Sequence, residues 1–153
     1  MQAEDNLNTH GNEEIVQLSC FYVGKALAGI DINQVQEINK ELEMTKVPLA
    51  QDYVLGIMNL RGKIVTIIDL GKKLGLEPGV WSDKSRIIII NWNDEYVGFF
   101  VDRITDVVIA AKKDISLPPS NIKGLKGKYF QGVYHYKKEL VAILDTDAVL
   151  NEE

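Results

Sequence analysis

The sequence holds few of the residues from which enzymes build reactive centres. It contains one cysteine, Cys20, and two histidines, His10 and His135. A single cysteine excludes an internal disulfide, and its apolar neighbours predict a small buried side chain in a reducing cytosol. No Cys/His cluster has the spacing of a metal site, so no metal or cofactor is expected. His10 lies in a polar N-terminal stretch, and we expect His135 on a strand face rather than as a catalytic base.

Long apolar runs and an excess of positive charge are also missing. No window approaches the roughly 20 apolar residues of a membrane-spanning helix, so membrane insertion is not expected. A net charge of -5 and a pI of about 5.1 disfavour binding to nucleic acid or anionic membranes. The first dozen residues are polar and lack the apolar core of a secretion signal. We therefore expect a cytoplasmic protein, with residues 1–12 as a disordered tail and residues 13–151 as a single domain.

Short segments rich in Val, Ile, Tyr and Phe make up most of the chain, and Gly, Asn, Asp and Lys separate them. This pattern predicts strands. The β-branched run RIIIINW at 86–92 predicts a strand buried on both faces. Weak helical signals at 49–56, 69–75 and 145–152 predict short connectors. The predicted strands cover residues 14–23, 26–32, 35–45, 56–61, 63–69, 85–92, 95–101, 104–111, 129–136 and 139–145.

The sequence contains an internal repeat. GIDINQVQEI from Gly29 matches GFFVDRITDV from Gly98, an offset of 69 residues. GIMNLRGKIVTIIDL from Gly56 matches GVYHYKKELVAILDT from Gly132, an offset of 76 residues. The second copy thus carries about seven extra residues, which lie in the Lys- and Gly-rich loop KDISLPPSNIKGLKGK.

Each repeat copy, approximately 14–80 and 84–150, holds about five short strands, enough to close a small barrel. We therefore predict an all-β fold of two pseudo-symmetric, five-stranded SH3-like barrel lobes packed together, with short helical connectors. The pattern leaves open which lobe each terminal strand joins. Barrels of about 65 residues have marginal cores, so the lobes should share apolar surface at a seam, and a groove beside it would suit a partner helix.

The stretch Asn59-Leu60-Arg61-Gly62 lies between two predicted strands. Gly62 suits a tight turn, and the Asn59 amide can bond nearby backbone groups. Arg61 offers five donors in a rigid fork to a partner's carboxylate or carbonyl oxygens. Together with GIDINQVQEI and YVGFFVDRITDVV, this stretch closely resembles the CheW family over nearly all of residues 14–150. One departure is Thr66, where the family commonly has proline.

The resemblance implies a non-catalytic chemotaxis adaptor that couples methyl-accepting chemoreceptors to the histidine kinase CheA. The expected partners are the cytoplasmic hairpin tip of a chemoreceptor and the CheW-like regulatory domain of CheA. The chain is expected to be a monomer when free and to join rings in receptor arrays. A CheW-like protein of a twitching or developmental pathway would have the same features. CheA and CheV-type proteins carry such a domain fused to others, whereas this chain ends at the domain boundary, which favours a free-standing adaptor.

The resemblance also assigns a receptor-binding surface. The residues expected there are Val35, Glu37, Gly56, Asn59, Leu60, Arg61, Gly62, Gly98 and Ile104. The chemistry of the residues leaves other roles open for three of them. Arg61 could be a surface arginine paired with an acid of its own lobe, Val35 could pack in the core, and Glu37 could be a solvated strand residue.

A second set of residues lies in the loop ISLPPSNI at 115–122. Its two prolines stiffen an extended chain and lower the entropic cost of ordering it on binding. A rigid connector that packs its own side chains would have the same sequence. The resemblance places contacts with CheA here, beside lysines that could steer an acidic partner. The residues expected to bind the kinase are Ile115, Ser116, Leu117, Asn121 and Ile122.

Asp69 and Asp145 recur at equivalent repeat positions, which raises the alternative of a small hydrolase with paired carboxylates. Each, however, ends an apolar strand just before a helical signal. At such a position Asp caps a helix N-terminus, a contribution of about 1 kcal/mol. We therefore predict caps rather than catalysis.

Overall fold

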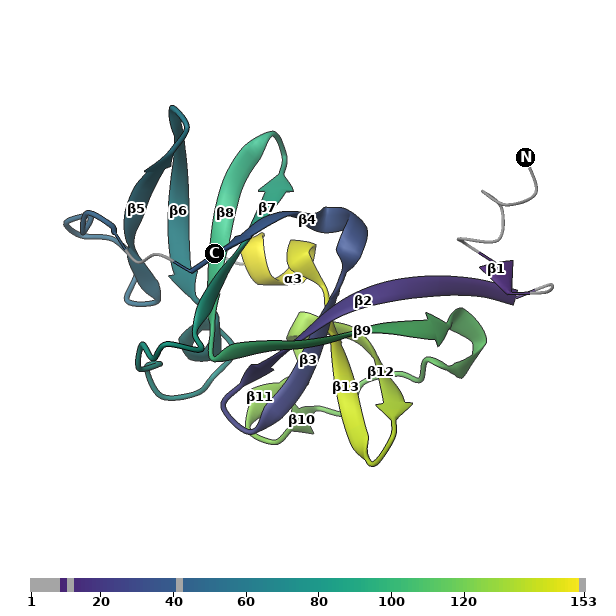
Figure 1. Cartoon of the computed structure of the whole chain (residues 1–153). Coiled ribbons are helices and arrows are strands. Elements are labelled where there is room, and N and C mark those ends of the chain that lie inside the picture. Colours follow the sequence, from purple (N-terminus) through teal and green to yellow (C-terminus); the bar gives the residue numbers. More distant parts are fainter. Residues whose placement is uncertain (1–8, 11–12, 41–42, 152–153) are drawn as a thin grey trace, which may run out of the picture.

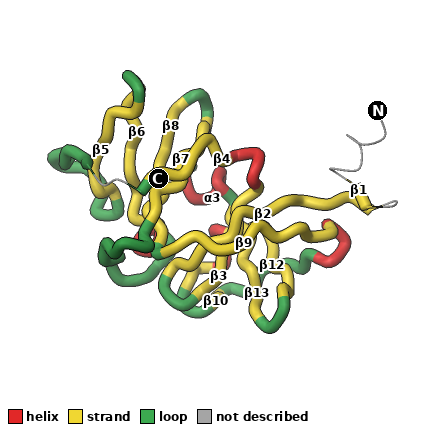
Figure 2. Tube along the Cα trace, in the orientation of Figure 1, coloured by secondary structure: helices red, strands yellow, loops and turns green. Residues whose placement is uncertain are grey.

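The computed structural model describes residues 9–10, 13–40 and 43–151. Most of the described chain is strand, and the few helical turns are confined to connectors (Figure 2). The strands are β1 (Thr9–His10), β2 (Glu13–Val23), β3 (Ala26–Asp31), β4 (Val35–Asn39), β5 (Val54–Leu60), β6 (Lys63–Asp69), β7 (Arg86–Trp92), β8 (Glu95–Val101), β9 (Arg103–Ala111), β10 (Asn121–Ile122), β11 (Leu125–Lys126), β12 (Phe130–Tyr136) and β13 (Glu139–Leu144). The helices are α2 (Leu70–Lys73) and α3 (Thr146–Leu150), with 3-10 turns η1 (Ile32–Gln34), η2 (Lys112–Asp114) and η3 (Gly127–Tyr129).

The strands form two lobes that lie side by side (Figure 1). The first lobe is a five-stranded sheet in the order β4-β7-β8-β6-β5. In the second lobe β9 and β3 flank β2, β13 and β12 follow β3, and the short β1 adds to β2. Both lobes have the same strand order once the repeat copies are aligned, which confirms the predicted pseudo-symmetric pair.

The two repeat copies exchange their first hairpins. β2 and β3 of the first copy join the second lobe, where β3 pairs in parallel with β13. β7 and β8 of the second copy join the first lobe, where β8 pairs in parallel with β6. The first lobe is therefore one continuous piece of chain, from β4 to β8. The second lobe combines the two flanking pieces.

Each sheet is closed into a barrel by one equivalent bridge. Thr45 exchanges two backbone hydrogen bonds of 2.8 Å with Ile57 of β5, and Ser116 exchanges two of 2.9 Å with Val133 of β12. Gly56 lies beneath the first bridge, where an added Cβ would lie 2.5 Å from the Thr45 carbonyl oxygen. Because no side chain fits there, glycine at this position is a requirement of barrel closure.

Three apolar clusters fill the two barrels and the seam between them. The largest combines buried residues of both lobes, so the predicted shared surface is confirmed. The sequence of β7 shows how one strand contributes to both a barrel and the shared cluster. Ile87 and Ile89 point into the first barrel, whereas Ile88 and Ile90 point into the shared cluster, and all four are at most 1% exposed. A strand buried on both faces has no reason to alternate, as predicted for this run.

Both short helices lie at the seam. Trp92 Nε1 of the first lobe donates a 2.8 Å hydrogen bond to Asp147 of α3. The backbone N–H of Lys126, from the β10–β11 hairpin, donates a 3.0 Å bond to the Leu74 carbonyl just after α2. The Lys73 ammonium lies 4.3 Å from the centroid of the Tyr53 ring and 5.8 Å from that of Tyr129, which are equivalent tyrosines of the two copies. Polar ties therefore add to the apolar contact between the lobes.

Three local predictions need correction. The predicted helix at 49–56 is wrong, because the chain makes a turn there (Val54 N to Gln51 O, 3.0 Å) and β5 begins at Val54. A helical turn over residues 54–56 would break the backbone pairing of this part of β5 with β6. The strand predicted over 35–45 ends at Asn39, opposite Ile87 near the start of its partner β7. Of the predicted tail 1–12, residues 9–10 form β1, and the others lie outside the described residues.

Candidate protein-interaction surfaces

The Asn59–Gly62 turn joins β5 to β6 through a two-residue loop. Arg61 and Gly62 have φ values of 51° and 85°, as a type I′ hairpin turn requires. Asn59 Oδ1 accepts a 2.9 Å hydrogen bond from the Gly62 N–H, which is the backbone contact predicted for this amide. The turn therefore fixes Arg61 at the tip of a rigid hairpin.

Arg61 forms an ion pair with Glu37 of β4. The two residues are 24 positions apart, and the closure of the first barrel brings β4 next to the β5–β6 turn. The Arg61 side chain is 74% exposed and that of Glu37 is 25% exposed. An ion pair within the lobe was the alternative role for Arg61, and it is present. A guanidinium has five donors, so one carboxylate oxygen does not saturate it.

Val35 and Ile104 occupy equivalent positions of the two copies, opposite Ile90 and Phe21 respectively. Both are half-buried and pack against the cluster that the lobes share. The core-packing role considered for Val35 is thus present, and both residues also keep partial exposure at the seam.

Three other residues expected at the receptor surface lie inside the molecule. Leu60 is 8% exposed and packs in the first barrel. Gly56 is buried, for the reason of barrel closure given above. Gly98 is buried too, and a Cβ there would lie 2.7 Å from Ile87 Cγ2. These glycines make room for the chain's own atoms, which corrects the expectation that Gly56 and Gly98 lie at a surface for a partner.

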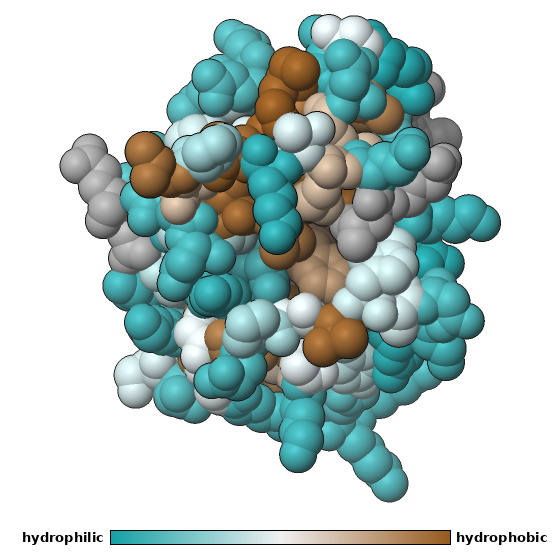
Figure 3. All heavy atoms as spheres, turned by 90° about the vertical axis from the view of Figure 1, so that its left-hand side faces the viewer, coloured by the Kyte–Doolittle hydropathy of each residue, from teal (hydrophilic) through white to brown (hydrophobic). Residues whose placement is uncertain are grey.

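The structure also exposes apolar residues that the sequence analysis did not select. Ile38 of β4 is 43% exposed and Val107 of β9 is 54% exposed, at equivalent repeat positions. Both follow the acidic position of the repeat, so the repeat motif could have identified them as an equivalent pair of apolar residues. On the first-lobe side of the molecule, apolar side chains emerge among hydrophilic ones (Figure 3). The full set of exposed large apolar residues in the described chain is Ile38, Val47, Leu49, Ile64, Val80, Val107, Ile109 and Leu117.

The predicted kinase-binding residues divide between surface and interior. Leu117 is 87% exposed, whereas Ile122 is 5% exposed and belongs to the shared cluster. Ile115 is half-buried against the second barrel, and Ser116 makes the closing bridge. Asn121 Oδ1 accepts a 3.0 Å hydrogen bond from the Gly124 N–H in another tight turn. Ile122 is thus not available as a surface contact, and Leu117 is the exposed apolar side chain that the loop presents.

The carboxylates of Asp69 and Asp145 cap α2 and α3. Asp69 accepts hydrogen bonds from the N–H groups of Lys72 (3.2 Å) and Gly79 (2.8 Å), and Asp145 accepts one from Ala148 (3.1 Å). The capping prediction is confirmed. Among the described residues, no group of three or more His, Cys, Asp or Glu side chains is placed to hold a metal ion. No helix in this part of the chain is long and apolar enough to span a bilayer.

Cys20 of β2 is 1% exposed, as predicted for a buried thiol. Burial, with a smaller contribution from the Asp106 carboxylate, raises the pKa of this thiol to about 12. Because the thiolate is the nucleophile, we expect native Cys20 to react with Ellman's reagent at pH 8 about a thousandfold more slowly than in the denatured chain. Stopped-flow absorbance with and without guanidinium measures this ratio, and equal rates would contradict it.

The same pKa shift links stability to pH. The folded chain keeps the Cys20 proton to higher pH than the unfolded chain, whose thiol titrates near a pKa of about 8.5. The contribution of the protonated thiol to the free energy of unfolding is complete at pH values below the pKa of the unfolded chain, and it is lost as the pH rises toward 12.

Comparisons with known proteins agree with this architecture. A family model described as CheW-like domain matches residues 17–153. A chemotaxis protein CheW of Treponema pallidum is 35% identical over 138 residues, covering 88% of this chain and 81% of that protein. A chemotaxis protein CheW of Bacillus subtilis is 35% identical over 133 residues, covering 87% and 85%. The crystal structure of scaffolding protein TtCheW from Thermoanaerobacter tengcongensis superposes with a TM-score of 0.79 at 29% identity, covering 89% of this chain and 88% of that one. The chain belongs to the CheW family.

Proposed function

We propose that the chain is a non-catalytic, cytoplasmic adaptor that couples chemoreceptors to the histidine kinase CheA. The names of the relatives, chemotaxis protein and scaffolding protein, support a role in chemotaxis signalling. The observation that carries the proposal is the exposed Arg61–Glu37 pair at the tip of a rigid hairpin. The Arg61 guanidinium keeps donors beyond those that Glu37 occupies, so this fixed arginine suits the polar side of an amphipathic helix, such as a receptor hairpin.

The kinase is proposed to bind elsewhere, at the loop around Leu117. This loop belongs to the second lobe, whereas Arg61 and Glu37 belong to the first. Docking on separate surfaces needs no chemical step, because holding two partners together raises their effective concentration. Each contact needs to be only micromolar, roughly -8 kcal/mol, for a multivalent array to be firm.

The proposal predicts that the chain bridges its two partners. Beads carrying a receptor's cytoplasmic hairpin should retain CheA well above background only when this chain is added, and an excess of chain should reduce retention because each partner is then occupied separately. Quantitative pull-down with purified components measures this bell-shaped dependence. If CheA retention is the same with and without the chain, the adaptor function is rejected.

A further inference from the structure

One residue, Asp102, joins two segments of the chain that otherwise meet through non-covalent contacts. β8 ends at Val101 and β9 begins at Arg103. The first segment, 13–101, contains the β2–β3 hairpin and the whole first lobe, and the second segment, 103–151, contains the rest of the second lobe. The second lobe is therefore built from both segments, and Asp102 is the covalent link between them.

The second segment needs the hairpin of the first segment to form its sheet. β2 and β3 lie in the middle of this sheet, with β9 on one side and β13 on the other. β9 pairs with β2 over residues 15–22, and β13 pairs with β3 over residues 27–29. A second copy of the chain carries an identical hairpin, so it can complete the sheet with every strand pair preserved.

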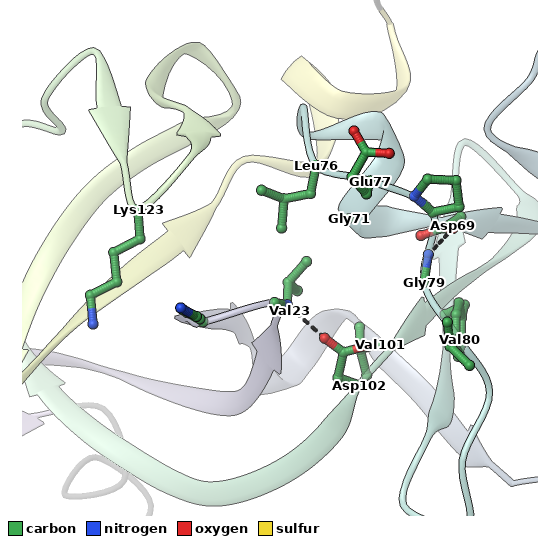
Figure 4. A pocket seen from close by; sticks show the side chains of 14 residues that line it. Val23, Asp69, Gly71, Leu76, Glu77, Gly79, Val80, Val101, Asp102 and Lys123 are labelled. Atoms are coloured by element: carbon green, nitrogen blue, oxygen red, sulfur yellow. Dashed lines mark hydrogen bonds between the residues drawn. The ribbon is translucent and has the colours of Figure 1, made fainter.

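Two hydrogen bonds hold the corner at Asp102. Its backbone N–H donates a 3.0 Å bond to the Tyr22 carbonyl, and its Oδ2 accepts a 2.6 Å bond from the Gly24 N–H (Figure 4). Both partners belong to the β2–β3 hairpin. Val101 and Asp102 also line a cleft of about 740 Å³, so the corner lies at the surface and not beneath packed side chains. A chain that ran straight through Asp102 would lose these two bonds.

The equivalent crossing of the first copy, from β3 to β4, contains more chain. There the three residues of η1 make a complete turn, and Asp31 Oδ1 accepts a 2.9 Å bond from the Asn33 N–H within the turn itself. Short connections favour an exchange of segments between copies of a protein, because they have little chain with which to turn back. The hinge of such an exchange is therefore expected at Asp102 and not at η1.

We propose that two copies of the chain form a domain-swapped dimer by exchanging residues 103–151, with Asp102 as the hinge. β9 and β13 of each copy then complete the sheet around the β2–β3 hairpin of the other copy. The strand pairs and the seam are kept, and the two corner hydrogen bonds of each copy are lost. A chain's own second segment competes at an effective concentration of about 1 mM, so the dimer is minor in dilute solution and increases where the chain is concentrated. If the adaptor function holds, the dimer presents the Arg61 turn and the Leu117 loop twice.

A disulfide between β2 and β9 tests the swap directly. Gln17 lies opposite Ile109, and residues so placed have Cβ atoms about 4.5–5.5 Å apart, close enough for a disulfide. In the variant Cys20→Ala/Gln17→Cys/Ile109→Cys, the introduced thiols are the only ones in the chain. This variant is refolded from guanidinium with reductant at about 1 mM and at about 1 μM chain, separated by size exclusion and then oxidised. We expect a dimer peak at the higher concentration that remains a dimer on a denaturing gel without reductant, because both disulfides then join different copies.

Changes at the hinge should shift the equilibrium in one direction. Asp102→Ala removes the bond to Gly24 that the monomer alone makes, at two hinges per dimer, so the association constant of the dimer should rise at least about tenfold. Deletion of Asp102 leaves no residue to turn the corner and should make the dimer the main species at about 0.1 mM. Deletion of Ala50, in the exposed loop between β4 and β5 of the first segment, is the matched control and should leave a monomer. Sedimentation equilibrium measures these populations.

Several results would exclude the domain-swapped dimer. The first is a dimer peak that runs as single chains on the denaturing gel, since surface contacts would then hold the copies together. The others are a folded monomer after deletion of Asp102, equal dimerisation of both deletion variants, and the absence of a dimer at about 1 mM in both the unmodified chain and Asp102→Ala. Asp102→Ala decides the outcome if the deletion variant does not fold. None of these measurements involves a receptor or CheA, so the result is independent of the adaptor function.

Discussion

Arg61→Glu is expected to abolish capture of the chain by a receptor's cytoplasmic hairpin while leaving CheA binding unchanged. Arg61 is 74% exposed at the tip of a rigid turn, so the substitution replaces a donor fork with a like charge beside Glu37. Loss of a central arginine typically costs an interface about 2–4 kcal/mol, a roughly 30- to 1000-fold loss of affinity. The fold should survive, because an exposed ion pair contributes at most about 1 kcal/mol. Calorimetry with the purified hairpin and with CheA measures the two affinities separately.

A charge swap separates direct contact from internal support. In Glu37→Arg/Arg61→Glu the ion pair within the lobe can form again with its ends reversed. If Arg61 contacts the receptor, the swapped protein should remain unable to bind. Recovery of normal binding in the swap would mean that Arg61 acts only through the ion pair within the lobe, and normal binding by the single Arg61→Glu variant would remove the turn from the receptor surface.

Ile122→Asp is expected to unfold most of the chain. Ile122 is 5% exposed in the cluster that both lobes share. The loss of a buried isoleucine side chain costs about 2–5 kcal/mol, and a carboxylate without a partner adds several more. That total is comparable to the whole free energy of unfolding of a typical domain, about 5–15 kcal/mol. Thermal unfolding followed by circular dichroism should show a lost or strongly lowered transition, and a transition within a few degrees of the unmodified chain would contradict the burial.

Leu117→Asp is the matched substitution at the surface of the same loop. With 87% exposure, Leu117 contributes little to folding, so the unfolding transition should stay within about 0.5 kcal/mol of the unmodified chain. CheA affinity should nevertheless fall by about 10- to 100-fold if this side chain anchors the kinase. A folded Leu117→Asp protein that binds CheA normally would exclude the loop from the interface.

The sequence was sufficient to predict ten principal strands and a fold of two similar lobes, because half-buried strands impose a period of two and the repeat imposes equivalence. The exchange of hairpins between the lobes could not be predicted from the sequence. Each hairpin has the same apolar faces as its counterpart, so β2–β3 would satisfy either lobe in a sequence pattern. The segment at 49–56 was misassigned because a short apolar run has no distinctive period, and barrel closure decides its conformation.

The parts of the candidate site that depend only on local backbone conformation could be predicted from the sequence. Asn59, Arg61 and Gly62 form the expected turn because the requirement for positive φ is local. The Arg61–Glu37 pair depends on barrel closure, in which Thr45, after β4, bridges to Ile57 of β5, and no local pattern specifies this contact. Ile122 and Leu117 illustrate the same limit, since two apolar residues five positions apart in a loop look alike until the second lobe and the seam bury one of them.

The insertion of one lobe within the other sets an order of assembly during synthesis. All strands of the first lobe, from Val35 to Val101, leave the ribosome as one stretch and can pair with neighbours already made. β3 must wait for its parallel partner β13, more than a hundred residues later, with its apolar face uncovered meanwhile. We therefore expect the first lobe to fold early and to bring the two outer segments together. A substitution that slows folding of the first lobe should leave the β2–β3 hairpin exposed for longer to association with other chains.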